Sequence, residues 1–251
     1  MMPDFEPKFM KNKLMDIPTE ELLNVLSRTV LFQGRWGFTK GRLSNEEYQK
    51  IIETKAKPAL EKLIRQESEN PVIECRSVFG FYKCYSEDNS IIVDLPEPVR
   101  FSFPRKADSE QPSCLADFVN ESNNFIAFFA TTIGSKIIEV EKKLFDANSY
   151  YDYHLLHGLG AELADCGAVV THRKLCEELV GRKLELTEKP FGCRYSFGYP
   201  ACPELAYQKL LFNILQPSKI GIFLTESCQM VPELSVSGFV LFNPSARYIV
   251  P

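Results

Sequence analysis

Residues 72–104 read VIECRSVFGFYKCYSEDNSIIVDLPEPVRFSFP, a stretch dominated by β-branched and aromatic residues. The sequences EDN at 87–89 and PEP at 96–98 interrupt it, and such residues favour turns. Three runs joined by short turns predict neighbouring antiparallel strands. Two later runs, NFIAFFATTIG at 124–134 and LSVSGFVLF at 234–242, predict further strands, and IGIFLTES at 220–227 is also strand-like.

Helical patterns flank these strands on both sides. Before them, PTEELLNVLSR at 18–28 has a proline and an acidic first turn, and Ser44 is placed to cap a second helix that Pro58 should kink or divide. After them, SKIIEVEKKLFDA at 135–147 is amphipathic, and residues 151–180 predict a long helix with Glu162, Asp165 and His172 away from its leucines. A last helix is expected at 204–215.

The order of these elements favours one fold class. Helices come first, then strands, then helices and strands again, without the strict alternation of a doubly wound parallel sheet. The sequence therefore predicts an α+β fold with an antiparallel sheet. At 251 residues, one large domain is the default expectation.

The composition excludes several classes of protein. A hydrophobic fraction of 45% and a charged fraction of 25% are typical of a globular chain. The net charge of −4 and the scattered basic residues argue against nucleic-acid binding. The apolar run FIAFFA is too short to span a membrane, and the charged N-terminus lacks the apolar region of a signal peptide. We expect a cytoplasmic protein without membrane or nucleic-acid partners.

The residues give no sign of a metal site or of catalytic side chains. The 8 cysteines are scattered without a CxxC pair, which favours reduced thiols, and there are 3 histidines. DYHLLHG at 152–158 is a near miss to the cobalamin-binding DxHxxG signature, and GLG at 158–160 lies in a helical pattern that indicates close helix packing. With no GxSxG or P-loop, any chemistry must come from positioning a bound reagent.

The segment Arg194 to Glu204, RYSFGYPACPE, is the strongest candidate for a binding site. Gly198, Pro200 and Pro203 predict an irregular, locally fixed backbone. Arg194 offers a planar fork that suits a carboxylate, and neighbouring aromatic rings could face a cation. From these residues alone, a packed structural loop with a surface arginine is an equal alternative.

A resemblance to a known family bears on that alternative. RYSFGYPACPE, CLADF at 114–118 and LTESCQMVPELSVSGFVLFNPSARY at 224–248 together resemble the S-adenosylmethionine-binding reactivation domain of cobalamin-dependent methionine synthase. LFQGRWGF and VFGFYKC extend the similarity from about residue 17 to the end. It implies a C-shaped single α+β domain over 17–251, with a twisted antiparallel sheet flanked by helices, after an N-terminal extension over 1–16.

The resemblance also implies a set of ligand residues. The family's acidic and arginine ligands correspond to Asp117 and Arg194, and its GYPACP motif is complete, including Gly198 and Tyr199. Its helix glutamate corresponds to Asp165, one methylene shorter; its C-terminal aromatic pair corresponds to Tyr248 and Ile249, so one ring is lost. We expect Arg194 to take the ligand carboxylate, Asp117 and then Asp165 the ammonium or ribose, and the tyrosines the adenosyl or sulfonium group.

The function that follows from the resemblance is reductive reactivation within methionine biosynthesis. In the family, an electron from a flavodoxin-like or ferredoxin-like donor and a methyl group from S-adenosylmethionine return oxidised cobalamin to methylcobalamin. A chain of this length leaves no room for the other modules, so we expect it to act in trans on the cobalamin-binding domain of a separate methionine synthase or corrinoid protein. It would belong to the methyltransferase class without a catalytic side chain of its own.

Two alternatives remain open at this point. One is a non-catalytic S-adenosylmethionine-binding regulator, because Ala161 stands where relatives often carry an aspartate that could meet the cobalamin domain. The other is activation of a corrinoid methyltransferase outside methionine synthesis.

Overall fold

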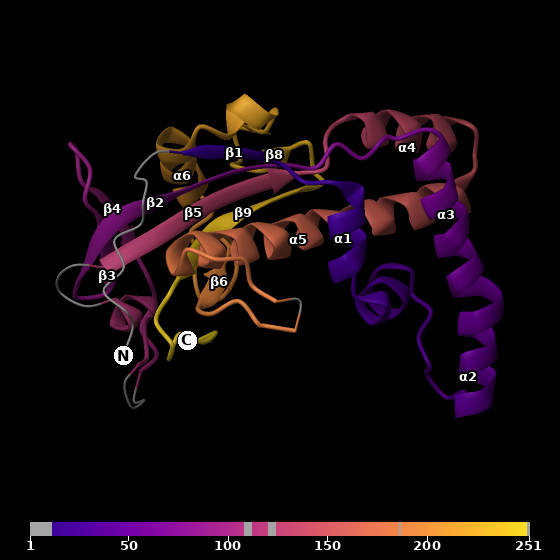
Figure 1. Ribbon diagram of the computed structural model, residues 1–251, viewed down its shortest axis with the longest axis horizontal. Helices are drawn as coiled ribbons and strands as arrows, with labels where there is room; N and C mark the ends of the chain where they lie inside the picture. The colour runs from indigo at the N-terminus through magenta and orange to yellow at the C-terminus, as the bar shows by residue number, and fades with distance from the viewer. Residues whose placement is uncertain (1–11, 108–111, 120–123, 186, 250–251) are drawn as a thin grey trace.

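The computed structural model describes residues 12–107, 112–119, 124–185 and 187–249. These residues form a seven-stranded sheet in the order β4-β3-β2-β5-β9-β6, with β1 also paired to β2 (Figure 1). Every pairing is antiparallel. The strands are β1 Lys13–Asp16, β2 Arg76–Glu87, β3 Ser90–Val93, β4 Val99–Ser102, β5 Asn124–Thr132, β6 Cys193–Tyr195 and β9 Ser235–Leu241.

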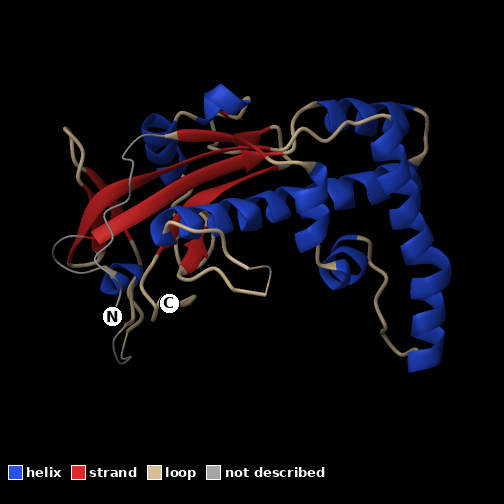
Figure 2. Cartoon of the chain, in the orientation of Figure 1, coloured by secondary structure: helices blue, strands red, loops and turns tan. Residues whose placement is uncertain are grey.

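Most of the helices gather at the end of the molecule away from the sheet, but one long helix runs from there along the sheet, and the last α-helix lies against the sheet itself (Figure 2). The α-helices are α1 Thr19–Val25, α2 Asn45–Ile51, α3 Lys57–Glu69, α4 Lys136–Asp146, α5 Tyr150–Val180 and α6 Tyr207–Leu215. Val30–Arg35 and Ile52–Ala56 are π-helical, Leu115–Phe118 and Pro217–Ile220 are 3-10 turns, and β7 Phe223–Leu224 pairs with β8 Met230–Val231. The α+β prediction with a flanked antiparallel sheet is confirmed.

The second predicted helix shows why the local sequence signals were informative. Ser44 caps α2 as predicted: its Oγ accepts from Glu47 N at 3.2 Å, and its own N donates to Glu47 Oε2 at 2.9 Å. A π-helical segment then separates α2 from α3, and Pro58 lies in the first turn of α3. The backbone stays in the right-handed helical region at Ile52, Ala56 and Lys57, so the helical run from Asn45 to Glu69 is continuous. The chain accommodates Pro58, which cannot donate a backbone hydrogen bond, by a change of helix type and not by the expected division.

The segment RYSFGYPACPE differs from its predicted irregular conformation at its start. Arg194 and Tyr195 belong to strand β6, which pairs with β9. The close approach depends on Gly238 of β9, since a Cβ there would collide with the Tyr195 carbonyl. The strand-like run at 220–227 forms only the two residues of β7.

The N-terminal boundary stays a prediction. Lys13–Asp16, the last residues of the expected extension, pair with β2 as strand β1, so the sheet reaches beyond residue 17 toward the N-terminus. Residues 1–11 lie outside the described part of the chain.

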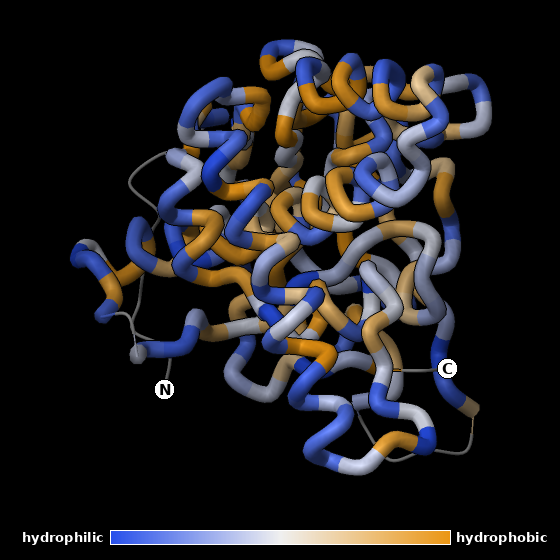
Figure 3. The backbone as a smooth tube through the Cα atoms, turned by 90° about the vertical axis from the view of Figure 1, so that its right-hand side faces the viewer, coloured by the Kyte–Doolittle hydropathy of each residue, from blue (hydrophilic) through white to orange (hydrophobic). Residues whose placement is uncertain are grey.

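The sheet is buried on both faces. Along β2, Val78 packs into an aromatic core with Phe101, Phe128 and Phe239, whereas Phe79 packs on the opposite face with Leu175 of α5. A third cluster lies among α1, α3, α4 and α5. Hydrophobic and hydrophilic residues alternate along the helical turns, as expected for helices with one buried side (Figure 3). No helix among the described residues has the length and apolarity to cross a membrane.

Helix α5 packs closely against its neighbours because glycines lie at the points of contact. A Cβ at Gly158 would lie 2.7 Å from Trp36 Cδ1, one at Gly160 2.8 Å from Leu234 Cδ1, and one at Gly167 2.8 Å from Thr131 Oγ1. The structural interpretation of GLG at 158–160 is therefore confirmed: both glycines lie within α5 and serve packing.

We predict that Gly158→Ala lowers the free energy of unfolding by about 1–3 kcal/mol, the usual cost of overpacking a buried site. The Trp36 ring cannot move aside easily, because its Nε1 donates to Leu155 O at 2.9 Å and it stacks on Phe32. Denaturant unfolding measures the change. Gly34→Ala is the control, since its Cβ would lie 3.8 Å from Val30 Cγ1; equal stability of the two variants would contradict the prediction.

Candidate functional site

Hydrogen bonds connect the three motifs that the sequence analysis singled out. Asn243 Nδ2 donates to the Phe118 carbonyl at 3.1 Å, which ties NPSARY to CLADF. Tyr195 OH donates to the Arg247 carbonyl at 2.9 Å, which ties NPSARY to RYSFG. The Tyr195 and Tyr248 rings also stack, with centroids 6.4 Å apart. We call the region where CLADF, RYSFG and NPSARY meet the motif junction.

The guanidinium of Arg194, in this region, has no charged partner among the described residues. Its Nη1 is buried without a hydrogen-bond partner, and among the described residues its guanidinium makes no ion pair within 4.0 Å. Burial lowers the pKa of Arg194 below its ordinary value, while the nearby Asp165 carboxylate acts in the opposite direction. A buried donor without an acceptor is costly, so this guanidinium is suited to bind an anion from outside the chain.

One face of α5 lies close to Arg194. The Asp165 carboxylate acts to raise the pKa of Arg194. His172 lies seven residues further along the helix, and the charge of Arg194 acts on it in turn. Burial lowers the pKa of His172 to about 4, the charge of Arg194 also lowers it, and Nε2 donates to the Phe191 carbonyl at 2.9 Å. His172 is therefore neutral at physiological pH and does not repel a second cation brought by a ligand.

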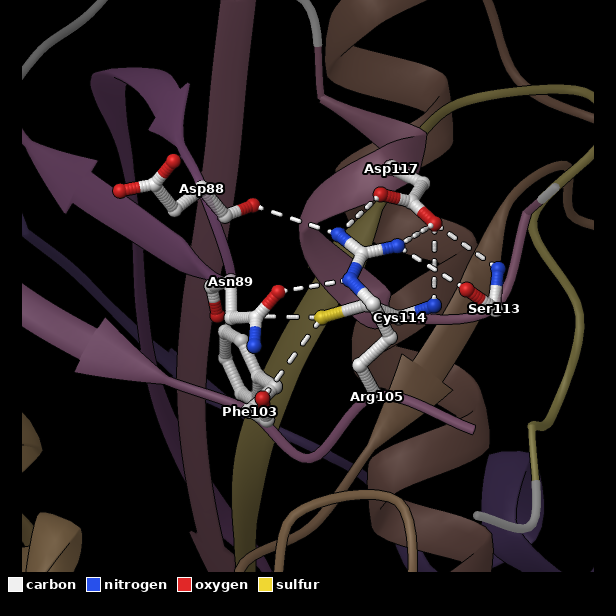
Figure 4. Close-up of polar contacts among 7 residues, drawn as sticks. All are labelled: Asp88, Asn89, Phe103, Arg105, Ser113, Cys114 and Asp117. Atoms are coloured by element: carbon white, nitrogen blue, oxygen red, sulfur yellow. Dashed lines mark hydrogen bonds and ion pairs between the residues drawn. The ribbon is translucent and has the colours of Figure 1, made fainter. Parts of the chain in front are cut away.

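Asp117 is held in a polar network at the other side of the junction (Figure 4). The Arg105 fork donates to both of its oxygens, from Nη1 to Oδ2 and from Nη2 to Oδ1, each at 2.8 Å. The backbone N–H groups of Ser113 and Cys114 donate to Oδ2 at 2.8 and 3.0 Å. Asn89 in turn accepts from Arg105 Nε at 2.7 Å. Asp117 is thus fixed by bidentate and backbone contacts together.

This network keeps Asp117 ionised. Partial burial raises the pKa of the carboxyl, but the Arg105 guanidinium and the two backbone N–H groups outweigh it, so the pKa lies below its ordinary value. The contacts are unequal, since Oδ2 accepts three hydrogen bonds and Oδ1 accepts one among the described residues. Each carboxylate oxygen has two lone-pair sites. Oδ1 therefore retains acceptor capacity for an ammonium or a hydroxyl.

Asp165 is engaged by a residue that the sequence analysis did not single out. Arg35, at the end of the π-helical segment, donates from Nη2 to Asp165 Oδ2 in a short ion pair and from Nε to Glu162 Oε2 at 3.2 Å. The Asp165 side chain is 50% exposed, whereas that of Glu162 is 7% exposed. Asp165 therefore presents its free side to solvent while Glu162 anchors the pair.

The GYPACP turn presents an aromatic ring beside the junction. Gly198 has φ +85°, and the turn is closed by Gly198 N donating to Cys202 O and Cys202 N to Tyr199 O, both at 2.8 Å. This exposes 59% of Tyr199, and Tyr248 is 46% exposed. Ile249 instead lies in the aromatic core, 8% exposed.

The structure thus brings some expected residues together and leaves others apart. Tyr248 and the strand that carries Arg194 are in direct contact through Tyr195. No hydrogen bond or ion pair joins Asp117 to Arg194 among the described residues. Arg105 and Arg35 were missed, because nothing in their spacing marks either arginine as the partner of an aspartate 12 or 130 residues away.

A cavity of about 330 Å³ lies elsewhere, between α1, α3, α4 and α5. Its lining is mainly apolar, and the charges at its edge are satisfied: Glu67 accepts from the N–H groups of Val72 and Ile73, and Lys62 pairs with Asp152 at 2.8 Å. Because it offers no unpaired charge, we place the candidate site at Arg194 and not here.

Most of the thiols of the chain are buried, and burial makes five of them hard to ionise. All 8 cysteines are free, and all except the half-buried Cys193 are buried. Burial raises the pKa of Cys75 to about 11, and of Cys84, Cys166, Cys176 and Cys202 to about 12. In the described ranges, no three His, Cys, Asp or Glu side chains converge on a point where they could hold a metal ion.

Comparisons with known proteins give matches over most or all of the chain. Residues 20–250 match the family model described as the activation domain of vitamin B12-dependent methionine synthase. Methionine synthase of Mycobacterium tuberculosis is 30% identical over 273 residues, covering 96% of this chain, and that of Mycobacterium leprae is 31% identical over 252 residues, covering 89%. The chain spans 23% and 21% of the length of these two proteins.

A solved structure has the same fold. The crystal structure of the MetH reactivation domain bound to AdoHcy superposes with a TM-score of 0.83, covering 100% of this chain and 83% of that chain. The sequences are 22% identical. At this sequence identity the similarity shows the fold alone, and it extends over the whole of this chain.

We predict that Asp117→Asn destabilises the fold by about 2 kcal/mol at neutral pH, as expected for weakened charge-assisted hydrogen bonds. The pKa of Asp117 is lower in the folded chain, so its contribution is present above the unfolded value of about 3.9 and is lost as the pH falls through the folded pKa. Unfolding measured from pH 7 to pH 3 should show the two proteins converging in acid. A stability difference that does not change with pH would contradict this account.

Proposed function

The chain belongs to the family of vitamin B12-dependent methionine synthase activation domains, and from this premise we propose that it binds S-adenosylmethionine and supports reductive methylation of a cobalamin. The cobalamin is carried by a partner domain on a separate methionine synthase or corrinoid protein. The electron comes from a flavodoxin-like or ferredoxin-like donor. Methionine biosynthesis is the process that this activity serves.

The observation that carries the proposal is the unpaired guanidinium of Arg194. S-adenosylmethionine ends in an amino-acid group with a carboxylate and an ammonium, so its binding site needs a cation and an anion. Arg194 provides a buried planar fork whose Nη1 has no partner, and arginine binds carboxylates in a bidentate manner. The ligand carboxylate would satisfy the donor that the fold leaves open.

Two carboxylates are available for the positive and hydroxyl groups of the ligand. Asp117 is ionised, held rigidly by Arg105 and able to accept one more hydrogen bond at Oδ1, which fits the ammonium or the ribose diol. Asp165, half-exposed and close to Arg194, adds a negative field on the α5 side. The lowered pKa of Asp117 keeps it ionised at neutral pH, as this role requires.

The exposed tyrosines fit the remaining part of the ligand. Tyr199 on the closed GYPACP turn and Tyr248 stacked on Tyr195 offer aromatic faces next to the junction. Aromatic faces attract cations such as a sulfonium and pack against the adenosyl ring. Ile249 lies next to Tyr248 and contributes backbone, since its side chain belongs to the core.

This arrangement also fits a site without a general base. S-adenosylmethionine supplies an already activated methyl group, so the protein has to bind it, orient it and exclude competing acceptors. Arg194 and Asp117 fix the amino-acid and ribose ends, and the rigid GYPACP turn limits movement of the ring beside them. A partner that carries cobalamin would approach the exposed side of the junction.

We predict that Arg194→Ala weakens S-adenosylmethionine binding by about 2 kcal/mol or more, because it removes one side of a desolvated charge pair. Isothermal titration calorimetry on the purified chain measures the change. Arg182→Ala is the matched control, since Arg182 pairs with Glu188 on the exposed surface. Unchanged affinity of the Arg194 variant would refute this ligand assignment.

We further predict that the chain restores a methionine synthase from which its own activation domain has been removed. In the presence of reductant, an electron donor and S-adenosylmethionine, the absorption spectrum should return to that of methylcobalamin, and the Arg194→Ala variant should restore it much more slowly. Tight ligand binding without any recovery would instead favour a non-catalytic S-adenosylmethionine-binding regulator.

A further inference from the structure

Asp165 pairs with one arginine and lies near a second. Arg35 Nη2 donates to its Oδ2, whereas Arg194 makes no ion pair with it within 4.0 Å in the described part of the chain. Arg194 is the partner of Val240 in the sheet, and Val240 belongs to the same hydrophobic cluster as Ala168 of α5, one helical turn after Asp165. The Arg35 side chain is 36% exposed, whereas Nη1 of Arg194 is buried and unsatisfied. A carboxylate released on this side of α5 would be attracted to the less hydrated guanidinium.

Arg35 is itself fixed in place. It ends the π-helical segment Val30–Arg35, and the Trp36 that follows is buried, with its N donating to Leu31 O and its Nε1 to Leu155 O, both at 2.9 Å. Trp36 also stacks on Phe32. The backbone at Arg35 therefore moves with the helical core, and its guanidinium reaches α5 from a rigid base.

Glu162 determines where the Arg35 fork points. Its carboxylate is 7% exposed and accepts from Arg35 Nε at 3.2 Å. Burial raises the pKa of Glu162, and the Arg35 charge opposes that effect. Because a buried carboxylate needs a partner, Glu162 retains Arg35, and the remaining Nη2 of the fork faces Asp165 one helical turn further along.

We propose that Arg35 is a positioning residue that holds Asp165 away from Arg194 and so keeps the Arg194 guanidinium open for the carboxylate of the ligand. The inference rests on the proposed function, because it concerns the same site. Without Arg35, Asp165 would turn to Arg194 and occupy the donors that S-adenosylmethionine needs. The anchor on Glu162 makes this arrangement a property of the fold and not of the ligand.

The test compares two ligands on the full chain by calorimetry. Arg35→Lys retains a cation for the buried Glu162, but a lysine ammonium cannot bridge two carboxylates as the fork does, so Asp165 is released. We expect Arg35→Lys to weaken S-adenosylmethionine binding about fivefold, the effect of a partly screened ion pair. Decarboxylated S-adenosylmethionine lacks the group that Arg194 binds, and its affinity should not change.

Removing the competing carboxylate should abolish the effect of Arg35→Lys. Arg35→Lys combined with Asp165→Asn is expected to bind S-adenosylmethionine within about twofold of Asp165→Asn by itself, because no carboxylate is left to compete for Arg194. Arg35→Gln combined with Glu162→Gln is a second variant without a buried unpaired charge, and it should also bind S-adenosylmethionine more weakly. Circular dichroism confirms that each variant is folded.

The outcomes separate the two proposals. Failure of the unaltered chain to bind S-adenosylmethionine overturns the proposed function and this inference with it. Normal binding by the unaltered chain, with loss in Arg194→Ala but none in Arg35→Lys, overturns the role of Arg35 alone. Equal weakening for both ligands, or a fivefold loss on adding Arg35→Lys to Asp165→Asn, would show that Arg35 acts through the general fold and would overturn its positioning role.

Discussion

The close passage of α5 beneath the sheet and against the N-terminal segment is the contact on which the other features depend. Three glycines on α5 remove the side chains that would otherwise separate it from Trp36, Leu234 and Thr131. Because the helix lies so near β5 and β9, its Asp165 and His172 come within electrostatic range of Arg194 on β6. The same approach brings Trp36 against Gly158 and so sets the position of Arg35. One packing constraint therefore aligns a strand, a helix and a π-helical turn around a single guanidinium.

The charges around the motif junction follow an uneven pattern. Asp117 is paired with Arg105, and Glu162 with Arg35, so the least exposed carboxylates of this region have partners within the chain. Arg194 differs from these groups, since its Nη1 is buried and has no acceptor among the described residues. Leaving this donor unsatisfied lowers the stability of the fold, and an apolar side chain there would avoid that cost. The unpaired donor is therefore the feature that supports the proposed binding of an external anion.

The sequence predicted the elements of this fold better than their contacts. Strand and helix patterns, the Ser44 cap and the irregularity next to Pro58 could be recognised because they depend on neighbours within a few residues. The pairing of Arg194 and Tyr195 with β9 could not, because it depends on a glycine 43 residues further along, at Gly238. In the same way, the candidate residues could be named from motifs, but Arg105 and Arg35 became visible only once the chain had folded, since each meets its aspartate through tertiary packing.

The burial of the thiols has a consequence for a protein proposed to hold an activated methyl group. A thiolate is a strong methyl acceptor, and Cys166 is the immediate neighbour of Asp165 on α5. Burial, reinforced by the charges of Glu162 and Asp165, raises the pKa of Cys166 to about 12, so at neutral pH almost none of it is ionised. If the chain binds S-adenosylmethionine as proposed, this burial disfavours methylation of its own thiol at this position.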